Sequence, residues 1–113
     1  MEYATYLGGD DYEQINFYDG KSYDLSNGKL SLLGRTRSTD FPVSPTAFQA
    51  VGGVGTNIDD VFLTQIDMAT GAQIYSTYIG GAANDYPSAL FVSGNNVYIG
   101  GTTGGTDFPV TQG

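Results

Sequence analysis

The chain has 113 residues, enough for one domain of ordinary size, and carries 12 acidic against 4 basic residues, a formal net charge of −8. This charge repels nucleic-acid phosphates and anionic membranes, so neither is an expected partner. The chain contains no histidine and no cysteine, which excludes disulfides, cysteine-ligated zinc and the usual nucleophilic triads.

Two sequence phrases recur in the same order. YATYLGG at 3–9 returns as YSTYIGG at 75–81, and TDFPV at 39–43 returns at 106–110. Such self-similarity is typical of a repeat protein. The 17 glycines, 9 tyrosines and 6 phenylalanines favour strands and tight turns, so the predicted fold is all-β.

The spacings of the repeated phrases differ. The offset is 72 residues for the Tyr phrases, 74 for Asp11-Tyr12 and Asp85-Tyr86, and 67 for the TDFPV phrases. We therefore expect two extra residues near Ala82-Ala83 in the second copy and seven extra residues in the first copy, between Tyr12 and Gly34. The second copy stops early, so we expect a fragment of a longer protein.

The first predicted hairpin has strands in 14–25 and 30–33 joined by a turn at 26–29, with the inserted residues around 18–21. The longest stretch without a strand is 35–60. In this loop, Phe41 and Phe48 are expected to pack against the sheet and so hold the loop on it. A helical turn is predicted at 44–48, because a serine is followed by proline, and Arg35 and Arg37 are expected to form local contacts beside Asp40.

Two further hairpins follow in the second half. Strands 61–66 and 74–79 flank a turn at 67–71, and strands 89–92 and 97–101 flank a turn at 93–96. Segment 61–66 is apolar on both faces, as expected for a strand between two neighbouring sheets. Each repeat thus reads as four short antiparallel strands, the unit from which β-propellers are built.

The ordered set of YSTYIGG, VYIGGTT at 97–103, TDFP with AFQ at 47–49, and DVFLT at 60–64 resembles the bacterial SBBP repeat, the seven-bladed β-propeller repeat. The resemblance implies antiparallel four-stranded propeller blades. Residues 1–13 would hold the outer strand of a preceding blade, at 2–8. Residues 14–81 would be a complete blade, and 82–113 would hold the inner strands of the next, at 88–103.

The resemblance also implies a large secreted or cell-surface bacterial protein in which the propeller is a scaffold or adhesion module without a catalytic centre. No signal peptide is visible in this chain. Because partial blades leave strand edges open, the expected partners are the rest of a longer propeller chain or other subunits of an assembly. The copies could also join through their terminal strands.

Calcium is the leading chemical alternative. Clusters of Asp beside Gly supply the oxygen ligands that this ion prefers, and the candidate ligands are Asp10, Asp11, Asp59, Asp60 and Asp85. The competing interpretation is that these carboxylates cap turns and bind backbone amides.

Carbohydrate is a second possible ligand, because tyrosine rings stack on sugars. Tyr18 and Tyr23 are the candidates, since they lie in or near the insertion; packing within the sheet is the competing interpretation. An enzyme with paired carboxylates comes third, and no catalytic residue is assigned.

Overall fold

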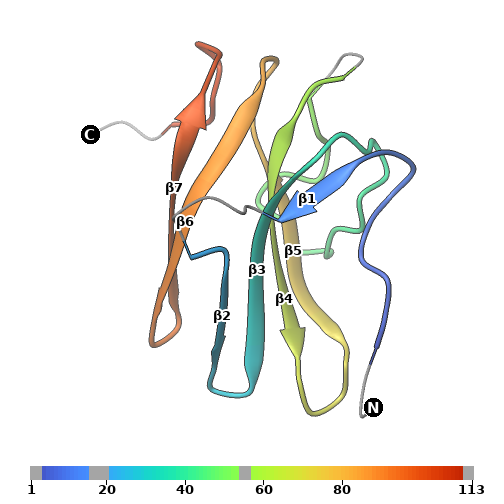
Figure 1. The fold of residues 1–113 in the computed structure, drawn as a ribbon, viewed down its shortest axis with the longest axis vertical. Coiled ribbons are helices and arrows are strands. Elements are labelled where there is room, and N and C mark those ends of the chain that lie inside the picture. Colours follow the sequence, from blue (N-terminus) through green and yellow to red (C-terminus); the bar gives the residue numbers. More distant parts are fainter. Residues whose placement is uncertain (1–3, 16–20, 54–56, 111–113) are drawn as a thin grey trace.

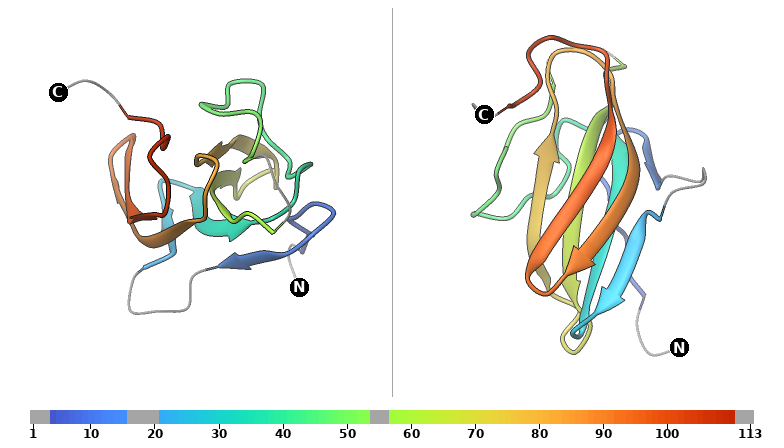
Figure 2. Two further views of the ribbon diagram at one scale, coloured as in Figure 1. Left: turned by 90° about the horizontal axis from the view of Figure 1, so that it is seen from above. Right: turned by 90° about the vertical axis from the view of Figure 1, so that its left-hand side faces the viewer.

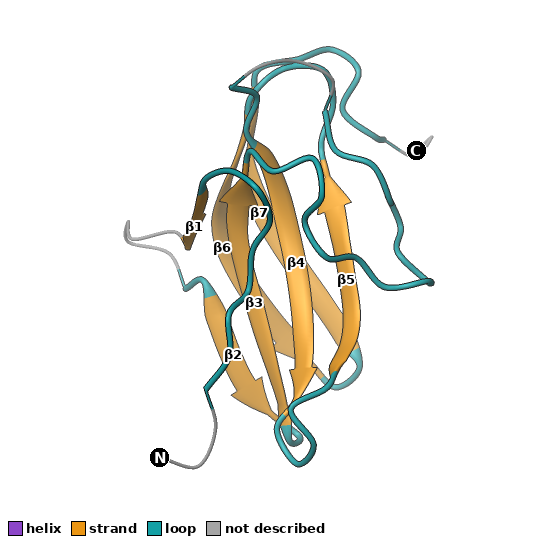
Figure 3. Ribbon diagram, turned by 90° about the vertical axis from the view of Figure 1, so that its right-hand side faces the viewer, coloured by secondary structure: helices purple, strands orange, loops and turns teal. Residues whose placement is uncertain are grey.

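The computed structural model describes residues 4–15, 21–53 and 57–110, and every regular element among them is a β-strand (Figures 1 and 3). The strands form two antiparallel sheets, so the predicted all-β fold is confirmed. Within these ranges, no helix has the length and apolar character needed to cross a membrane.

The larger sheet is a meander in chain order. β3 (Lys29–Thr36), β4 (Asp60–Asp67) and β5 (Gln73–Ile79) are successive neighbours. Two short strands, β1 (Glu13–Ile15) and β2 (Tyr23–Ser26), both pair with the other edge of β3. β1 lies beside the end of β3 and β2 beside its beginning, so together they occupy one strand position. We call the segment from β1 to β5 unit one.

The smaller sheet is a hairpin of β6 (Asp85–Ser93) and β7 (Asn96–Thr103). Figure 2 shows this hairpin stacked face to face on the larger sheet, where β6 contacts β2, β3 and β4. We call β6, β7 and the following residues 104–110 unit two.

All three predicted hairpin turns are confirmed. The β2–β3 turn uses Asn27 and Gly28 with φ of 54° and 71°, the β4–β5 turn uses Gly71 at 73°, and the β6–β7 turn uses Gly94 at 59°. Positive φ at both Asn27 and Gly28 marks the β2–β3 turn as type I′, whose twist suits a two-residue hairpin. These turns could therefore be predicted from the residues of each turn alone.

The strand registers show which residues of the two units correspond. Thr36 and Thr103 each precede a TDFPV phrase by three residues, and their ladder partners are Glu13 and Asp85. Glu13 is therefore the counterpart of Asp85, at the same offset of 72 as the Tyr phrases. The alignment of Asp11-Tyr12 with Asp85-Tyr86 was wrong, and the predicted extra residues at Ala82-Ala83 do not exist.

Unit one differs from unit two by an interruption of its first strand position. β6 is a strand of nine residues with one irregularity between Pro87 and Ala89, whereas unit one has β1 and β2 in the same position. The register makes Ile15 the counterpart of Pro87, at an offset of 72, and Tyr23 the counterpart of Leu90, at an offset of 67. Unit one therefore has five extra residues between Ile15 and Tyr23, partly outside the described residues, and not the seven predicted.

β4 is buried on both faces, as its sequence predicted. Val61 and Leu63 pack with Leu33 and Leu90 between the two sheets. Phe62 points to the opposite face of the larger sheet, where it stacks on Phe41 at a centroid distance of 4.5 Å. Since each face contributes its own apolar cluster, β4 holds two packing layers together.

The loop between β3 and β4 corrects two predictions. Residues 44–48 form no helix; Ala47 N–H donates to Ser44 O at 3.0 Å in a tight turn, while Ser44 N–H binds Ser76 O on β5. The N–H groups of Phe48 and Gln49, which a helix would have used, donate to Tyr75 Oη and Thr77 Oγ1 of β5 at 3.2 Å and 2.8 Å. Phe41 is buried as expected, but Phe48 is exposed.

The N-terminal segment also departs from the prediction. A strand was expected over 2–8, but the described residues 4–8 belong to no strand. A strand forms only against a partner, and the predicted partner, an earlier blade, is not among the described residues.

Candidate functional site at the acidic junction of the two sheets

Three of the five predicted acidic ligands meet where the two sheets join. Asp59, Asp60 and Asp85 are 1%, 3% and 0% exposed, and Asp85 N–H donates to Asp59 O at 2.7 Å. Asp10 and Asp11 do not join them. Both are exposed in the loop before β1, where the N–H of Asp10 binds Asp40 Oδ1 and that of Asp11 binds Ser38 Oγ.

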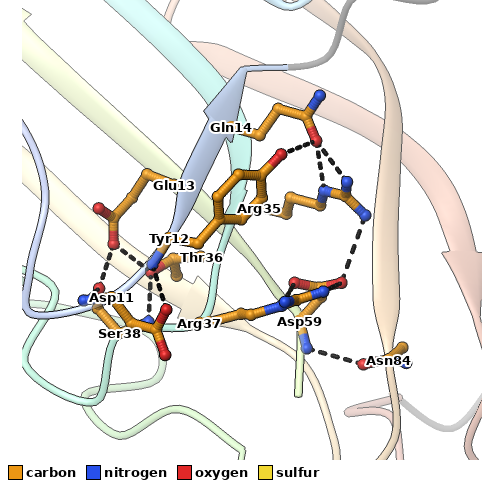
Figure 4. A network of polar contacts seen from close by, with 10 residues as sticks. All are labelled: Asp11, Tyr12, Glu13, Gln14, Arg35, Thr36, Arg37, Ser38, Asp59 and Asn84. Atoms are coloured by element: carbon orange, nitrogen blue, oxygen red, sulfur yellow. Dashed lines mark hydrogen bonds and ion pairs between the residues drawn. The ribbon is translucent and has the colours of Figure 1, made fainter. Parts of the chain in front are cut away.

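Asp59 is neutralised by two arginines (Figure 4). Arg37 Nε lies 2.8 Å from Asp59 Oδ1, and Arg35 Nη1 lies 3.3 Å from Asp59 Oδ2. The bond to Asp59 raises the pKa of the Arg37 guanidinium above its ordinary value. A buried carboxylate is tolerated when it is paired and hydrogen bonded in this way. Asp59 is therefore a structural ion-pair partner.

The two arginines are held in place by polar and aromatic neighbours. Gln14 Oε1 accepts a hydrogen bond from Arg35 Nε at 2.8 Å. The Arg35 guanidinium lies 5.7 Å from the centroid of Tyr12 and 5.2 Å from that of Tyr86, and Arg37 also lies over Tyr12 at 5.4 Å. Because Arg35 belongs to β3 and Tyr86 to β6, which lie in different sheets, this cluster ties the two units together.

Asp60 and Asp85 are only half satisfied. Asp60 Oδ2 accepts a hydrogen bond from Gly53 N–H, and Asp85 Oδ2 accepts one from Gly81 N–H at 2.9 Å. The other oxygen of each, Oδ1, is buried without a hydrogen-bond partner. Burial raises the pKa of Asp60, and the charges of Asp85 and Asp59 raise it further, against the lowering effect of the Gly53 bond.

The two carboxylates converge on glycine backbone. A Cβ built on Gly80 would collide with Asp60 Oδ1 and would lie 2.7 Å from Asp85 Oδ2. A Cβ on Gly53 would lie 2.8 Å from the carbonyl oxygen of Gly81 and 3.1 Å from Asp60 Oδ1. Oxygens of Asp60, Asp85 and Gly81 therefore lie close against the backbone of Gly53 and Gly80, where only glycine leaves room for them.

No group of three or more acidic, histidine or cysteine side chains suited to a metal occurs in the described part of the chain. The junction offers two carboxylates instead, because Asp59 is engaged by arginine. Such an arrangement could share a proton or hold a hard cation with help from backbone carbonyls.

The predicted sugar-binding tyrosines receive different outcomes. Tyr18 lies outside the described residues. Tyr23 is exposed on β2, opposite Leu32. Its counterpart in unit two is Leu90, which is buried between the sheets. Tyr23 thus occupies a position that unit two uses for packing between sheets.

An apolar groove lies beside the junction. It has a volume of about 440 Å³, and its walls include Val61 and Ile79 of unit one and Ile99 and Phe108 of unit two. Phe108 comes from the second TDFPV phrase and is only partly buried. Its counterpart Phe41 is buried beneath Phe62 and Tyr78.

The loops around the junction repeat one contact. Asp40 Oδ1 accepts the N–H of Asp10 at 2.7 Å, and Asp107 Oδ1 accepts the N–H of Ala82 at 3.1 Å. Asp40 and Asp107 hold the same place in the TDFPV phrase, and Asp10 and Ala82 each follow a Gly-Gly pair. The two repeated phrases therefore recur together because one binds the other.

No family model, curated protein or solved structure matches this chain.

Sequence reasoning missed the roles of Arg35 and Arg37, whose partner is Asp59 and not the neighbouring Asp40. It also missed the backbone of Gly53, Gly80 and Gly81 as the lining of the acidic junction. The repeated Gly-Gly was the available signal, since a conserved phrase with two adjacent glycines indicates close approach of another group.

Proposed function

We propose that this chain is a non-catalytic interaction module of β-propeller type, part of a larger secreted or surface protein as the resemblance to SBBP repeats implies. Unit one corresponds to a complete blade, and unit two to the inner half of the next. In this proposal, unit two is completed by a further pair of strands like β4 and β5. The interaction is then strand addition along β7, supported by burial of aromatic side chains.

The observation that carries the proposal is the contrast between Phe41 and Phe108. Phe41 stacks on Phe62 of β4 and meets the Tyr78 ring of β5 edge-on, with ring centroids 6.1 Å apart. Phe108, in the same phrase, faces the apolar groove. Unit two lacks counterparts of β4 and β5 among the described residues, so a strand pair carrying such aromatic residues fits this groove.

Tyr78 shows what the missing strands would supply. Its hydroxyl donates to Ser38 O at 2.8 Å and accepts the N–H of Phe41 at 2.9 Å, so β5 fastens the first TDFPV loop. Burial raises the pKa of the Tyr78 phenol, which keeps it a neutral donor. The earlier copy of this tyrosine, Tyr6, is fully exposed. We infer that Tyr6 belongs against the TDFPV loop of a preceding unit.

A strand pair suits the open edge better than a second copy of the chain. β3 pairs with β4, but β7, its counterpart, pairs within the described residues only with β6. Residues 4–8 of another copy could supply a β5-like strand with Tyr6, but the β4-like strand between it and β7 would still be missing. The required occupant is therefore two strands of a further repeat unit.

Exposed side chains on β2 also support a series of stacked units. Tyr23 and Leu25 are exposed on β2, while their counterparts Leu90 and Val92 pack against unit one. If units stack in series, Tyr23 and Leu25 are the surface that meets the preceding unit. This role accounts for Tyr23 without a sugar ligand.

The test is to complete unit two with the chain's own sequence. Residues 111–113 are replaced by a second copy of 44–81, which continues the repeat in phase from Val110. We expect a single cooperative unfolding transition at a higher temperature, and slower amide hydrogen exchange along β7. A matched control carries alanine in place of the copied Phe62 and Tyr78, and should lose most of this gain.

Two results would contradict the proposal. One is an extended chain whose β7 amides exchange as fast as before and whose unfolding temperature does not rise. The other is light scattering that shows a dimer of the original chain which Tyr6→Ala dissociates, because a second copy would then be the occupant.

A further inference from the structure

We propose that Asp60 and Asp85 bind a calcium ion between the two units, with the carbonyl oxygen of Gly81 as a third protein ligand. This goes beyond the scaffold function and does not depend on it. The site joins β4 of unit one to β6 of unit two, so the ion would fix the angle between successive units.

The first argument is the lack of hydrogen-bond partners. Asp60 and Asp85 are both more than nine-tenths buried, and the Oδ1 atom of each has no hydrogen-bond donor. Burial of an unpaired carboxylate oxygen is costly, because the group loses its water and gains nothing in return. A cation bound to both oxygens removes this cost and also removes the repulsion between the two charges.

The second argument is the closeness of the oxygens. Asp60 Oδ1 and Asp85 Oδ2 both lie within 2.7 Å of the point where a Cβ on Gly80 would stand, and a Cβ on Gly53 would meet both Gly81 O and Asp60 Oδ1. Calcium–oxygen bonds are about 2.3–2.6 Å long, so oxygens of different segments that lie this close together can share an ion. Because Gly53 and Gly80 have no Cβ, neither places a side chain between these oxygens.

Unit one provides an internal comparison. Glu13, the counterpart of Asp85, lies against Gly8 as Asp85 lies against Gly80. Its carboxylate accepts hydrogen bonds from Thr36 Oγ1 at 2.7 Å and from Ser38 Oγ.

In unit two the corresponding positions are Thr103 and Gly105. Thr103 Oγ1 accepts the N–H of Gly105 at 3.2 Å, as Thr36 Oγ1 accepts that of Ser38, but no hydroxyl reaches Asp85 Oδ1, and the serine hydroxyl is absent. Asp85 Oδ1 therefore lacks the donors that satisfy Glu13 in unit one, and a cation would replace them.

The chemistry of the ligands selects the ion. All the available atoms are carboxylate or carbonyl oxygens, which favour a hard cation over zinc or copper. Calcium accepts irregular oxygen sites, whereas magnesium demands near-ideal octahedral geometry. The net charge of −8 also favours cation binding.

Terbium, which occupies calcium sites and luminesces when a nearby tyrosine is excited, is the direct probe. The Tyr78 ring borders the site, because a Cβ on Gly52 would lie 2.8 Å from Asp60 Oδ2 and 2.9 Å from Tyr78 Cε1. We expect saturable terbium emission that calcium displaces. Asp60→Asn and Asp85→Asn should each weaken binding at least about tenfold, and Glu13→Gln, the matched control, should leave it unchanged.

Thermal unfolding gives an independent readout on the unaltered chain. Millimolar calcium chloride should raise the unfolding temperature by about 4 °C or more relative to EDTA, and magnesium should raise it less. The proposal is overturned if calcium shifts nothing, or if terbium emission survives both Asp→Asn changes.

Discussion

The two copies of the Tyr phrase, at 3–9 and 75–81, differ in whether their second tyrosine is buried. Tyr78 belongs to β5, is 1% exposed and fastens the first TDFPV loop, whereas Tyr6, in the corresponding position of the earlier copy, is 102% exposed and outside any strand. The second TDFPV phrase shows the same contrast, because Phe41 is buried and Phe108 borders an open groove. Equal sequences therefore differ in structure according to whether their partner is present.

The difference teaches that β-structure here depends on neighbours more than on the phrase itself. Strand propensity is largely a measure of packing against adjacent strands. Within unit one, Tyr78 of the second Tyr phrase binds the first TDFPV loop. Tyr6 and Phe108, the other copies of these aromatic residues, are not packed together in this way among the described residues.

The largest expected effect distinguishes the two tyrosines. Tyr78→Ala should lower the free energy of unfolding by about 3–5 kcal/mol, because it opens a cavity beside Phe41 and removes both hydrogen bonds of the hydroxyl. Tyr6→Ala should change it by less than about 0.5 kcal/mol. Urea unfolding followed by tyrosine fluorescence measures both. Equal losses would show that residues 4–8 pack in solution.

The two phenylalanines should differ by somewhat less. Phe41→Ala is expected to cost about 3 kcal/mol and Phe108→Ala about 1 kcal/mol, since only the first ring is fully covered. In the chain extended with a second copy of 44–81, the cost of Phe108→Ala should approach that of Phe41→Ala. A cost that stays small after extension would argue against completion of unit two.

Alanine substitutions at a crowded and an open glycine test the packing at the acidic junction. Gly80→Ala should destabilise by about 1–3 kcal/mol, because its Cβ would press on the carboxylates of Asp60 and Asp85. Gly100→Ala on β7 meets nothing within 4 Å and should be nearly neutral. Circular dichroism during heating tests this pair. A harmless Gly80→Ala would mean that the space between the carboxylates is larger than the structure indicates.

The smallest effect concerns the hydroxyl that satisfies Glu13. Ser38→Ala removes the bonds of Ser38 Oγ to Glu13 and to the N–H of Asp11, and should cost about 1 kcal/mol. The exposed Ser93→Ala is the control and should be neutral within about 0.5 kcal/mol. If Ser38→Ala were as harmless, unit one would not need this hydroxyl. The glycine at the corresponding position of unit two, Gly105, would then not explain why Asp85 lacks a donor.

Much of the fold could be predicted from the sequence because the information is local. Three hairpins are predicted by Asn27 and Gly28 and by the glycines at 71 and 94. A central strand is predicted by the segment 61–66, which is apolar on both faces. The site was predicted less well. Asp59, Asp60 and Asp85 were candidates, but sequence could not tell that arginine neutralises one and that the other two face each other.

The errors have one physical cause. The alignment of Asp11 with Asp85 relied on matching letters, while the ladder pairs Glu13 with Thr36 and so makes Glu13 the counterpart. Residues 44–48 carry a helix-start signal, but β5 takes their backbone hydrogen bonds. In both cases a neighbouring strand overrode the local pattern.

The sequence by itself determined that this protein repeats, that its repeats are antiparallel β-structure, and where its chain turns, because turns and alternation depend on neighbouring residues. Only the tertiary structure decided which copy of each phrase is buried, which acid pairs with arginine, and which two carboxylates lie together. Those outcomes depend on contacts between residues far apart in the chain, and on whether the strand that completes them is there.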